Sequence, residues 1–301
     1  MSKYLLGLVM SLLIITGMNS GVLADEVGGP TSGKAGEFKL ELKMEEFTQK
    51  VETDKTRFSL ITANTFQQDF ELLDTEQTMN RLFLKGSYNI NEKWTASLKL
   101  GKATTSLKVG QSLVYQYDPG VIDDIDSYYL GSNLTSESGS YLGLGIKGVI
   151  HQAGDFTVSV DFQLAQQSVT DVGQLAKTQW YDSSVHSYYY EDLKVTDAKT
   201  TSYQLALVLA KKVGELDLYG GPKLYFATTT YKGEYRERDT TPAWAYTYKK
   251  SFDFESKAAG FMDNLSLFGG VNWTLKENMS FNFEIEVGGT VGSSAGVAFK
   301  F

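Results

Sequence analysis

A histidine flanked by serines and aspartates is the first place to look for chemistry in this chain. His186 lies in the segment WYDSSVHSYYYED, together with Ser184, Ser187, Asp182 and Asp192. These residue types can form a nucleophilic triad, but a working triad converges from separate elements that hold it rigidly. Because these residues are neighbours in sequence, a solvated loop histidine explains His186 better than a catalytic one.

The other candidates for catalysis or metal binding are weaker. The second histidine, His151, lies in the short segment HQAGD, where a tight turn is expected. The acidic run DDID at residues 123–126 lacks the fuller set of spaced ligands that a dedicated calcium loop uses. We therefore expect a non-enzymatic protein with no metal or other cofactor.

Charged side chains recur at every second position in several segments. In the segment at residues 37–47, Lys39, Glu41, Lys43 and Glu45 alternate with Phe38, Leu40, Leu42 and Met44. A period of two is typical of a β-strand with one polar and one apolar face. What these charged side chains can do depends on how the strands are arranged, because the arrangement decides which environment their polar faces share.

The same alternation predicts ten strands, made up of one opening strand, four hairpins and one closing strand. They are expected at residues 37–47, 80–90, 94–103, 141–150, 155–166, 202–210, 215–227, 264–275, 279–287 and 294–301. Short connections join the members of each hairpin, whereas long polar loops are expected near residues 48–78, 103–138, 169–200 and 230–263. Short turns on one rim and long loops on the other are the layout of an outer-membrane barrel. Residues 56–66 also alternate, so eight or twelve strands are alternatives.

A soluble β-sandwich would show the same period, but the apolar faces favour a barrel. They are roughly nine to eleven residues long, which is the length that crosses a bilayer at a steep tilt. The final segment, SAGVAFKF, places Ala295, Val297, Phe299 and Phe301 on one face up to the last residue. A strand that closes a barrel must be paired along its whole length, so we expect an antiparallel, up-and-down transmembrane barrel.

The first residues are typical of a secretory signal peptide. Lys3 precedes an apolar run at residues 4–15, and small residues lie near Ala24, as in a cleaved signal. We expect a signal peptide at 1–24, a short periplasmic segment at 25–35 and the barrel at 36–301. The formal net charge of −8 argues against a nucleic-acid partner, and the absence of cysteine excludes disulfides.

With these features in place, the chain resembles the outer membrane protein β-barrel domain family of Gram-negative bacteria. The resemblance rests on segments such as FKLELKMEEF, RLFLKGSYNINEKWTASLKLGKA, YGGPKLYF, LSLFGGVNWTLKENMSFNFEIEV and the terminal AGVAFKF. It implies a location in the outer membrane, contact with outer-membrane lipid, and recognition of the last strand by the barrel-assembly machinery. The family contains pores, adhesins and members of unknown role, so no activity is implied; the omptin proteases are similar in layout.

The polar faces should bring many charges into the lumen. The expected lumenal charges are Lys39, Glu41, Lys43, Glu45, Arg81, Lys85, Lys99, Lys147, Asp161, Asp217, Lys223, Glu284, Glu286 and Lys300. Ten strands make a barrel little wider than the eight-stranded kind, which side chains fill, and buried charges persist when they are paired. We therefore expect a lumen closed by ion pairs, with the cations of residues 39–85 paired to Glu41, Glu45, Glu284 and Glu286. A narrow passive channel is the alternative.

The long loops are rich in aromatic residues with polar tips. This group includes Tyr128, Tyr129, Trp180, Tyr181, Tyr188, Tyr189, Tyr190, Trp244, Tyr246 and Tyr248. Such residues suit a membrane interface, but the alternation in AWAYTYKKSFDFES also predicts strands that continue above the membrane. The second interpretation gives a surface that contacts a ligand, a glycan or a protein. A structural or surface-interaction role is thus expected first, a narrow channel second and an omptin-like surface hydrolase third.

Overall fold

The computed structural model describes most of the chain after its first residues. The described residues are 34–53, 56–59, 67–73, 75–109, 111–118, 121–128, 133–182, 187–239, 246–258 and 260–301. For the described residues within 56–73, 111–133 and 175–193, and for most of those within 235–252, only the backbone is described. The expected signal peptide and most of the periplasmic segment lie outside the described residues.

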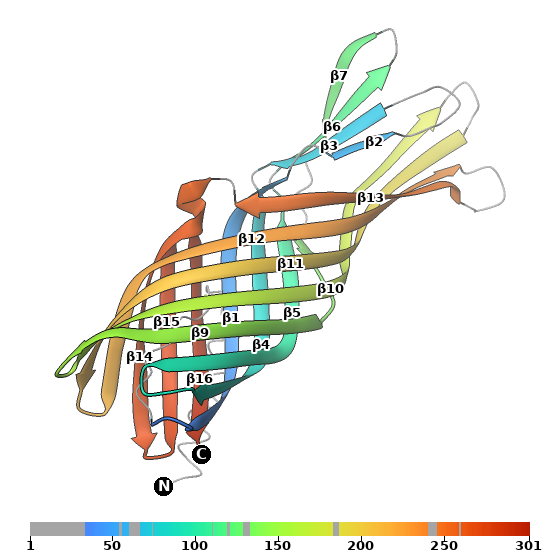
Figure 1. Cartoon of the computed structure of the whole chain (residues 1–301). Coiled ribbons are helices and arrows are strands. Elements are labelled where there is room, and N and C mark those ends of the chain that lie inside the picture. Colours follow the sequence, from blue (N-terminus) through green and yellow to red (C-terminus); the bar gives the residue numbers. More distant parts are fainter. Residues whose placement is uncertain are drawn as a thin grey trace.

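Ten antiparallel strands close into a ring, as predicted (Figure 1). In ring order they are β1 (Phe38–Thr53), β4 (Thr75–Asn89), β5 (Trp94–Lys108), β9 (Gly139–Ala153), β10 (Phe156–Asp182), β11 (Ser187–Val213), β12 (Leu216–Asp239), β14 (Leu265–Lys276), β15 (Met279–Gly288) and β16 (Thr290–Lys300). The first and last strands pair from Lys39 opposite Lys300 to Gln49 opposite Thr290. The terminal residue is included, because the Phe301 N–H donates to the Phe38 carbonyl at 2.9 Å. The predicted fold class, a ten-stranded up-and-down barrel, is confirmed.

Several smaller elements lie outside this ring. They are β2 (Thr56–Ser59), β3 (Gln67–Leu73), β6 (Gln111–Asp118), β7 (Val121–Tyr128), β8 (Asn133–Thr135), β13 (Tyr246–Ala258) and the 3-10 turn η1 (Phe261–Asn264). Strands β2, β3, β6 and β7 form a separate four-stranded sheet that projects beyond the long-loop end of the barrel (Figure 1). The first part of the alternating segment 56–66 is thus β2, which adds nothing to the ring; residues 60–66 lie outside the described part.

In the part of the chain that the structure describes, no helix is long and apolar enough to cross a membrane.

The ring narrows toward the long-loop end because β13 replaces three strands there. Strand β12 pairs with β14 as far as Leu224 opposite Leu265, and with β13 from Thr228 opposite Lys257. Strand β1 likewise pairs with β16 as far as Gln49 and with β13 from Val51 opposite Ala258. Strand β8 continues β9 along β5. Replacing β14, β15 and β16 by β13 leaves eight strands around the upper section.

The barrel wall is consequently tall on one side and short on the other (Figure 1). Strands β10 and β11 each have 27 residues and β12 has 24, whereas β14 has 12, β15 has 10 and β16 has 11. The strands expected to end near residues 166 and 227 continue as cross-strand ladders up to residues 182 and 239. Backbone hydrogen bonds between strands form in water as well as in lipid, so this part of the sheet does not need a membrane around it.

Two of the short turns contain glycines in the left-handed region. Gly154 follows β9 with φ 57°, and Gly214 follows β11 with φ 62°. Two-residue hairpin turns favour positive φ because the twist of such turns matches that of the paired strands. These glycines explain why the turns at this rim can be so short.

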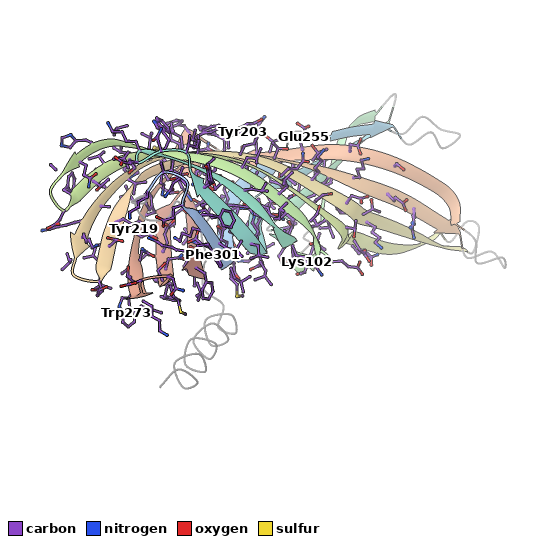
Figure 2. The ribbon with its side chains drawn as sticks, turned by 60° about the horizontal axis from the view of Figure 1, so that its bottom comes forward. Lys102, Tyr203, Tyr219, Glu255, Trp273 and Phe301 are labelled. Carbon is purple, nitrogen blue, oxygen red and sulfur yellow. The ribbon has the colours of Figure 1, made fainter. Side chains whose placement is uncertain are left out.

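The outward side chains form an apolar band with a sharp upper edge. Within the band, Leu42 is 55% exposed, Leu144 54% and Ile285 50%. Above it, outward positions carry charges such as Lys102, and Glu76 pairs with Lys108 at 3.2 Å. Figure 2 shows Tyr203 and Glu255 on the outer side of the wall, the first over the band and the second over the extended section. An exposed apolar belt of this kind faces lipid.

We predict that an arginine substituted within the apolar band lowers the stability of the folded barrel, whereas one substituted above the band has little effect. Leu144→Arg places a charge against hydrocarbon and should destabilise the barrel by about 2–4 kcal/mol near the midplane. Ser140→Arg, on the same face of β9 but above the band, should change stability by less than about 1 kcal/mol. Urea unfolding from lipid bilayers measures both, and equal losses would contradict this placement of the membrane.

Candidate functional site: the barrel lumen

The structure places the fourteen predicted lumenal charges on the inner side of the ring. Ten are buried: Glu41, Lys43, Glu45, Arg81, Lys99, Lys147, Asp161, Lys223, Glu284 and Glu286. The other four, Lys39, Lys85, Asp217 and Lys300, line a cavity at the short-turn end. The alternation of the strands explains this arrangement, since every second side chain of each strand points inward.

Arg81 of β4 lies at the centre of the buried charges. Its guanidinium carbon is 4.6 Å from the ring centre of Phe47 and 4.5 Å from that of Tyr141. Its Nη1 is 3.7 Å from Oε2 of Glu45, whose Oε1 is 3.5 Å from the ammonium of Lys99. One buried carboxylate is thus shared by two cations, and the arginine is held between two aromatic rings, where cation–π attraction adds to the ion pair.

A second buried pair joins β12 to β15. The Lys223 ammonium donates to Oε2 of Glu286, and the Thr290 hydroxyl donates to the other oxygen of the same carboxylate. The sequence predicted that Glu286 would pair across the closing seam with cations of the first strands. It binds Lys223 instead, because inward side chains of β12 and β15 reach each other across the intervening β14.

Arg81 and several polar side chains above it connect elements that are not neighbours in the ring. Nε of Arg81 donates to Oε1 of Gln167 on β10 at 3.1 Å, and Gln77 of β4 donates to the Thr229 hydroxyl of β12 at 3.1 Å. Gln49 of β1 donates to the Asp263 carbonyl of η1 at 2.9 Å. Hydrogen bonds of this length between separated strands mean that the walls meet inside the barrel.

A cluster of buried apolar side chains extends into the eight-stranded upper section, beside buried polar ones such as Thr105 and Thr229. This cluster contains Phe83, Ala103, Leu107, Val109, Leu134, Tyr141, Ala165, Val169, Val172, Val195, Ala198, Tyr231 and Phe254. The Tyr231 and Phe254 rings stack with centres 4.7 Å apart, and burial raises the pKa of the Tyr231 phenol, which keeps it neutral. An apolar core therefore lies above the charged layers.

The short-turn end of the lumen contains a cavity. This cavity has a volume of about 250 Å³ and is lined almost entirely by polar residues. Lys39 is 2.8 Å from Oε1 of Glu41, and Lys147 is 3.5 Å from Asp161. From the short turns upward, the lumen thus passes from a solvated cavity through buried ion pairs to an apolar core.

The sequence analysis did not identify Phe47, or the amide side chains of Gln77 and Gln167, as residues that fill the lumen. Phe47 has the same parity as Glu41 and Glu45, so its inward position could have been found from the alternation. It is fully buried, and its ring lies 5.2 Å from that of Tyr225 on β12. Phe83, Tyr219, Tyr225 and Phe268 are buried as well.

The terminal strand has the orientation that its alternation predicted. Phe299 is 43% and Phe301 77% exposed on the outer side, while Ala295 and Val297 are half-buried on the same face. Recognition of these residues by the assembly machinery stays a prediction.

The surface aromatic residues are described only in part. Tyr128, Trp180, Tyr181, Tyr188, Tyr189, Tyr190, Tyr246 and Tyr248 lie in β7, β10, β11 and β13 by backbone position, whereas Tyr129 and Trp244 lie outside the described residues. The backbone register pairs Trp180 with Tyr189 and Tyr181 with Tyr188. Aromatic residues are thus concentrated where the extended sheet ends.

The candidate catalytic residues are not assembled in the described structure. Ser184 and His186 lie outside it, and only the backbone is described for Asp182, Ser187 and Asp192. His151 lies at the end of β9, at the short-turn rim. Among the residues with described side chains, no group of three or more histidines and carboxylates could hold a metal ion.

Comparison with known proteins gives no family by sequence. No family model matches the chain, and no curated protein matches it. Solved structures with related outlines include the outer membrane protease OmpT of Escherichia coli, with 8% identity and a TM-score of 0.41 over 88% of this chain and 97% of that one. They also include the outer membrane protein OprG of Pseudomonas aeruginosa, with 12% identity and a TM-score of 0.33 over 90% and 98%. The toluene transporter TbuX of Ralstonia pickettii has 11% identity and a TM-score of 0.29 over 89% of each chain.

The class of this protein follows from its own geometry. A closed ring of antiparallel strands, an apolar outer band and a charged interior together define a transmembrane β-barrel.

We predict that the charge of Glu45 stabilises the barrel. Glu45→Gln leaves the Arg81 and Lys99 cations without their shared carboxylate, and breaking a buried pair in this way costs about 3–5 kcal/mol. Glu76→Gln, which removes the exposed partner of Lys108, should cost no more than about 1 kcal/mol. Urea unfolding compares the two variants, and similar values would show that the Glu45 pairs contribute no more than a surface pair.

Proposed function

We propose that this protein is a non-enzymatic outer-membrane barrel with a closed lumen, which presents its extended strands and second sheet outside the cell. The observation that carries this proposal is the set of contacts across the lumen, above all Gln77 to Thr229 and Phe47 to Tyr225. An interior filled in this way leaves no room for a solute to pass. The features that remain to carry a function are then the extended strands and the second sheet, which lie above the apolar band.

The outer face of the upper section supports this assignment. Lys232 of β12 has Asp197 and Asp253 as its register partners on the two neighbouring strands, and Glu52 of β1 has Lys257 of β13. Opposite charges on neighbouring strands belong to a surface in water, since they stabilise strand pairing there. The upper section, with aromatic residues near its end, therefore suits contact with a partner at the cell surface. Tyrosine and tryptophan are enriched where proteins bind one another.

A narrow passive channel is the second candidate. It is favoured by the polar cavity at the short-turn end, which enters the lumen as far as Lys147 and Asp161. Passage through the barrel would then require the apolar core around Leu107 and Val195 to open. A channel and a closed barrel differ in conductance.

Planar-bilayer recording tests the closed lumen. Protein whose folded state has been verified by its heat-modifiable migration should give no defined conductance steps in about 1 M salt, because the apolar core blocks water and ions. A variant that removes side chains from this block, Leu107→Ala with Phe254→Ala, shows in parallel whether an opened barrel would be detected. Defined steps from the unmodified protein would contradict the closed lumen and favour the channel.

A further inference from the structure

The cavity at the short-turn end has a highly charged lining, and a closed lumen does not account for it. All ten ring strands contribute to its lining, and its volume is about 250 Å³. Among the residues that the structure describes, the lining includes six lysines and five carboxylates, with Met279 as the one large apolar side chain. The cavity is therefore built from the whole ring.

Glu41 and Glu37 each have a partner at both carboxylate oxygens. Oε1 of Glu41 accepts from Lys39 at 2.8 Å and from Asn282 at 3.1 Å, while Oε2 lies 3.6 Å from Lys85. Glu37 faces Lys300 at 3.3 Å with one oxygen and accepts the Lys34 backbone N–H at 3.2 Å with the other.

The Asp161 carboxylate likewise has a partner at each of its two oxygens. Its Oδ1 accepts from Gln163 at 2.7 Å, and its Oδ2 lies 3.5 Å from Lys147. These carboxylates therefore hold the cations in place, and each of their oxygens already has a donor within the protein.

The lysines keep donor capacity that the carboxylates do not use. Each ammonium has three N–H donors, and the pairs formed by Lys39 and Lys300 engage one carboxylate each. The side chains of these two lysines are 28% and 40% exposed, and Lys212 lines the same cavity. In the described lining, lysines outnumber carboxylates by one. With donors also in excess, the cavity has the character of an anion site.

We propose that this cavity binds a small organic dianion that carries carboxylate or phosphate groups. At ~30 Å³ for each water, a volume of about 250 Å³ accommodates about eight waters, or a ligand with a similar number of non-hydrogen atoms. The ligand enters from the short-turn side and needs no passage through the barrel. The site is thus independent of whether the lumen conducts.

Isothermal titration of the folded, detergent-solubilised barrel tests this site. Succinate has eight non-hydrogen atoms and should bind saturably at one site, with weaker binding at higher salt; the neutral 1,4-butanediol should not bind. Inorganic phosphate, titrated in parallel, shows whether the site prefers phosphate over carboxylate. Saturable binding of either anion supports the proposal, and absence of binding by both overturns it.

Variants locate the binding. Lys39→Gln with Lys300→Gln, and separately Lys212→Gln, should each weaken binding of the anion tenfold or more. Lys108→Gln, whose lysine is exposed at the opposite end of the barrel, should leave the affinity unchanged. Folding of each variant is verified by heat-modifiable migration, and the Lys212 variant guards against misfolding of the double variant. Equal affinity in all variants would mean that the anion binds elsewhere and would overturn the proposal.

Discussion

The position of β13 between β1 and β12 determines how much space the barrel interior has. Below this strand, ten strands surround a lumen that includes a cavity of about 250 Å³. Above it, three strands are replaced by one, and a ring of eight strands is narrow enough for side chains to fill. The apolar core around Leu107, Val195 and Tyr231 follows from this narrowing.

The charges below the core are arranged according to their access to water. Arg81, Lys99 and Glu45 are almost fully buried and are stabilised by one another and by aromatic rings. Toward the short turns, Lys39 and Lys300 form pairs that water also reaches. A buried charge needs a partner because desolvation is costly, whereas a solvated one retains donors for other ligands. One barrel therefore holds a buried layer of ion pairs and an open polar cavity.

The alternation of the sequence was sufficient to predict the ten strands and their faces, because period two is a local property. It could not predict that the segment containing AWAYTYKKSFDFES would insert between β1 and β12. Which distant segments pair is a property of the whole ring and its register, and the local alternation does not contain that information. The pairing of Glu286 with Lys223 was missed for the same reason. Phe47 was accessible to prediction, since an aromatic residue on the polar face of a strand indicates a filled interior.

Disulfide cross-linking measures the position of β13 directly. The chain has no cysteine, so an engineered pair is unambiguous. Val51 and Ala258 are register partners, and partner positions in a sheet lie within the range of distances that a disulfide can bridge. Val51→Cys with Ala258→Cys should cross-link in the folded barrel, whereas Val51→Cys with Phe254→Cys should not. Failure of the first pair to cross-link in folded protein, or equal cross-linking of both, would contradict the narrowing of the ring to eight strands.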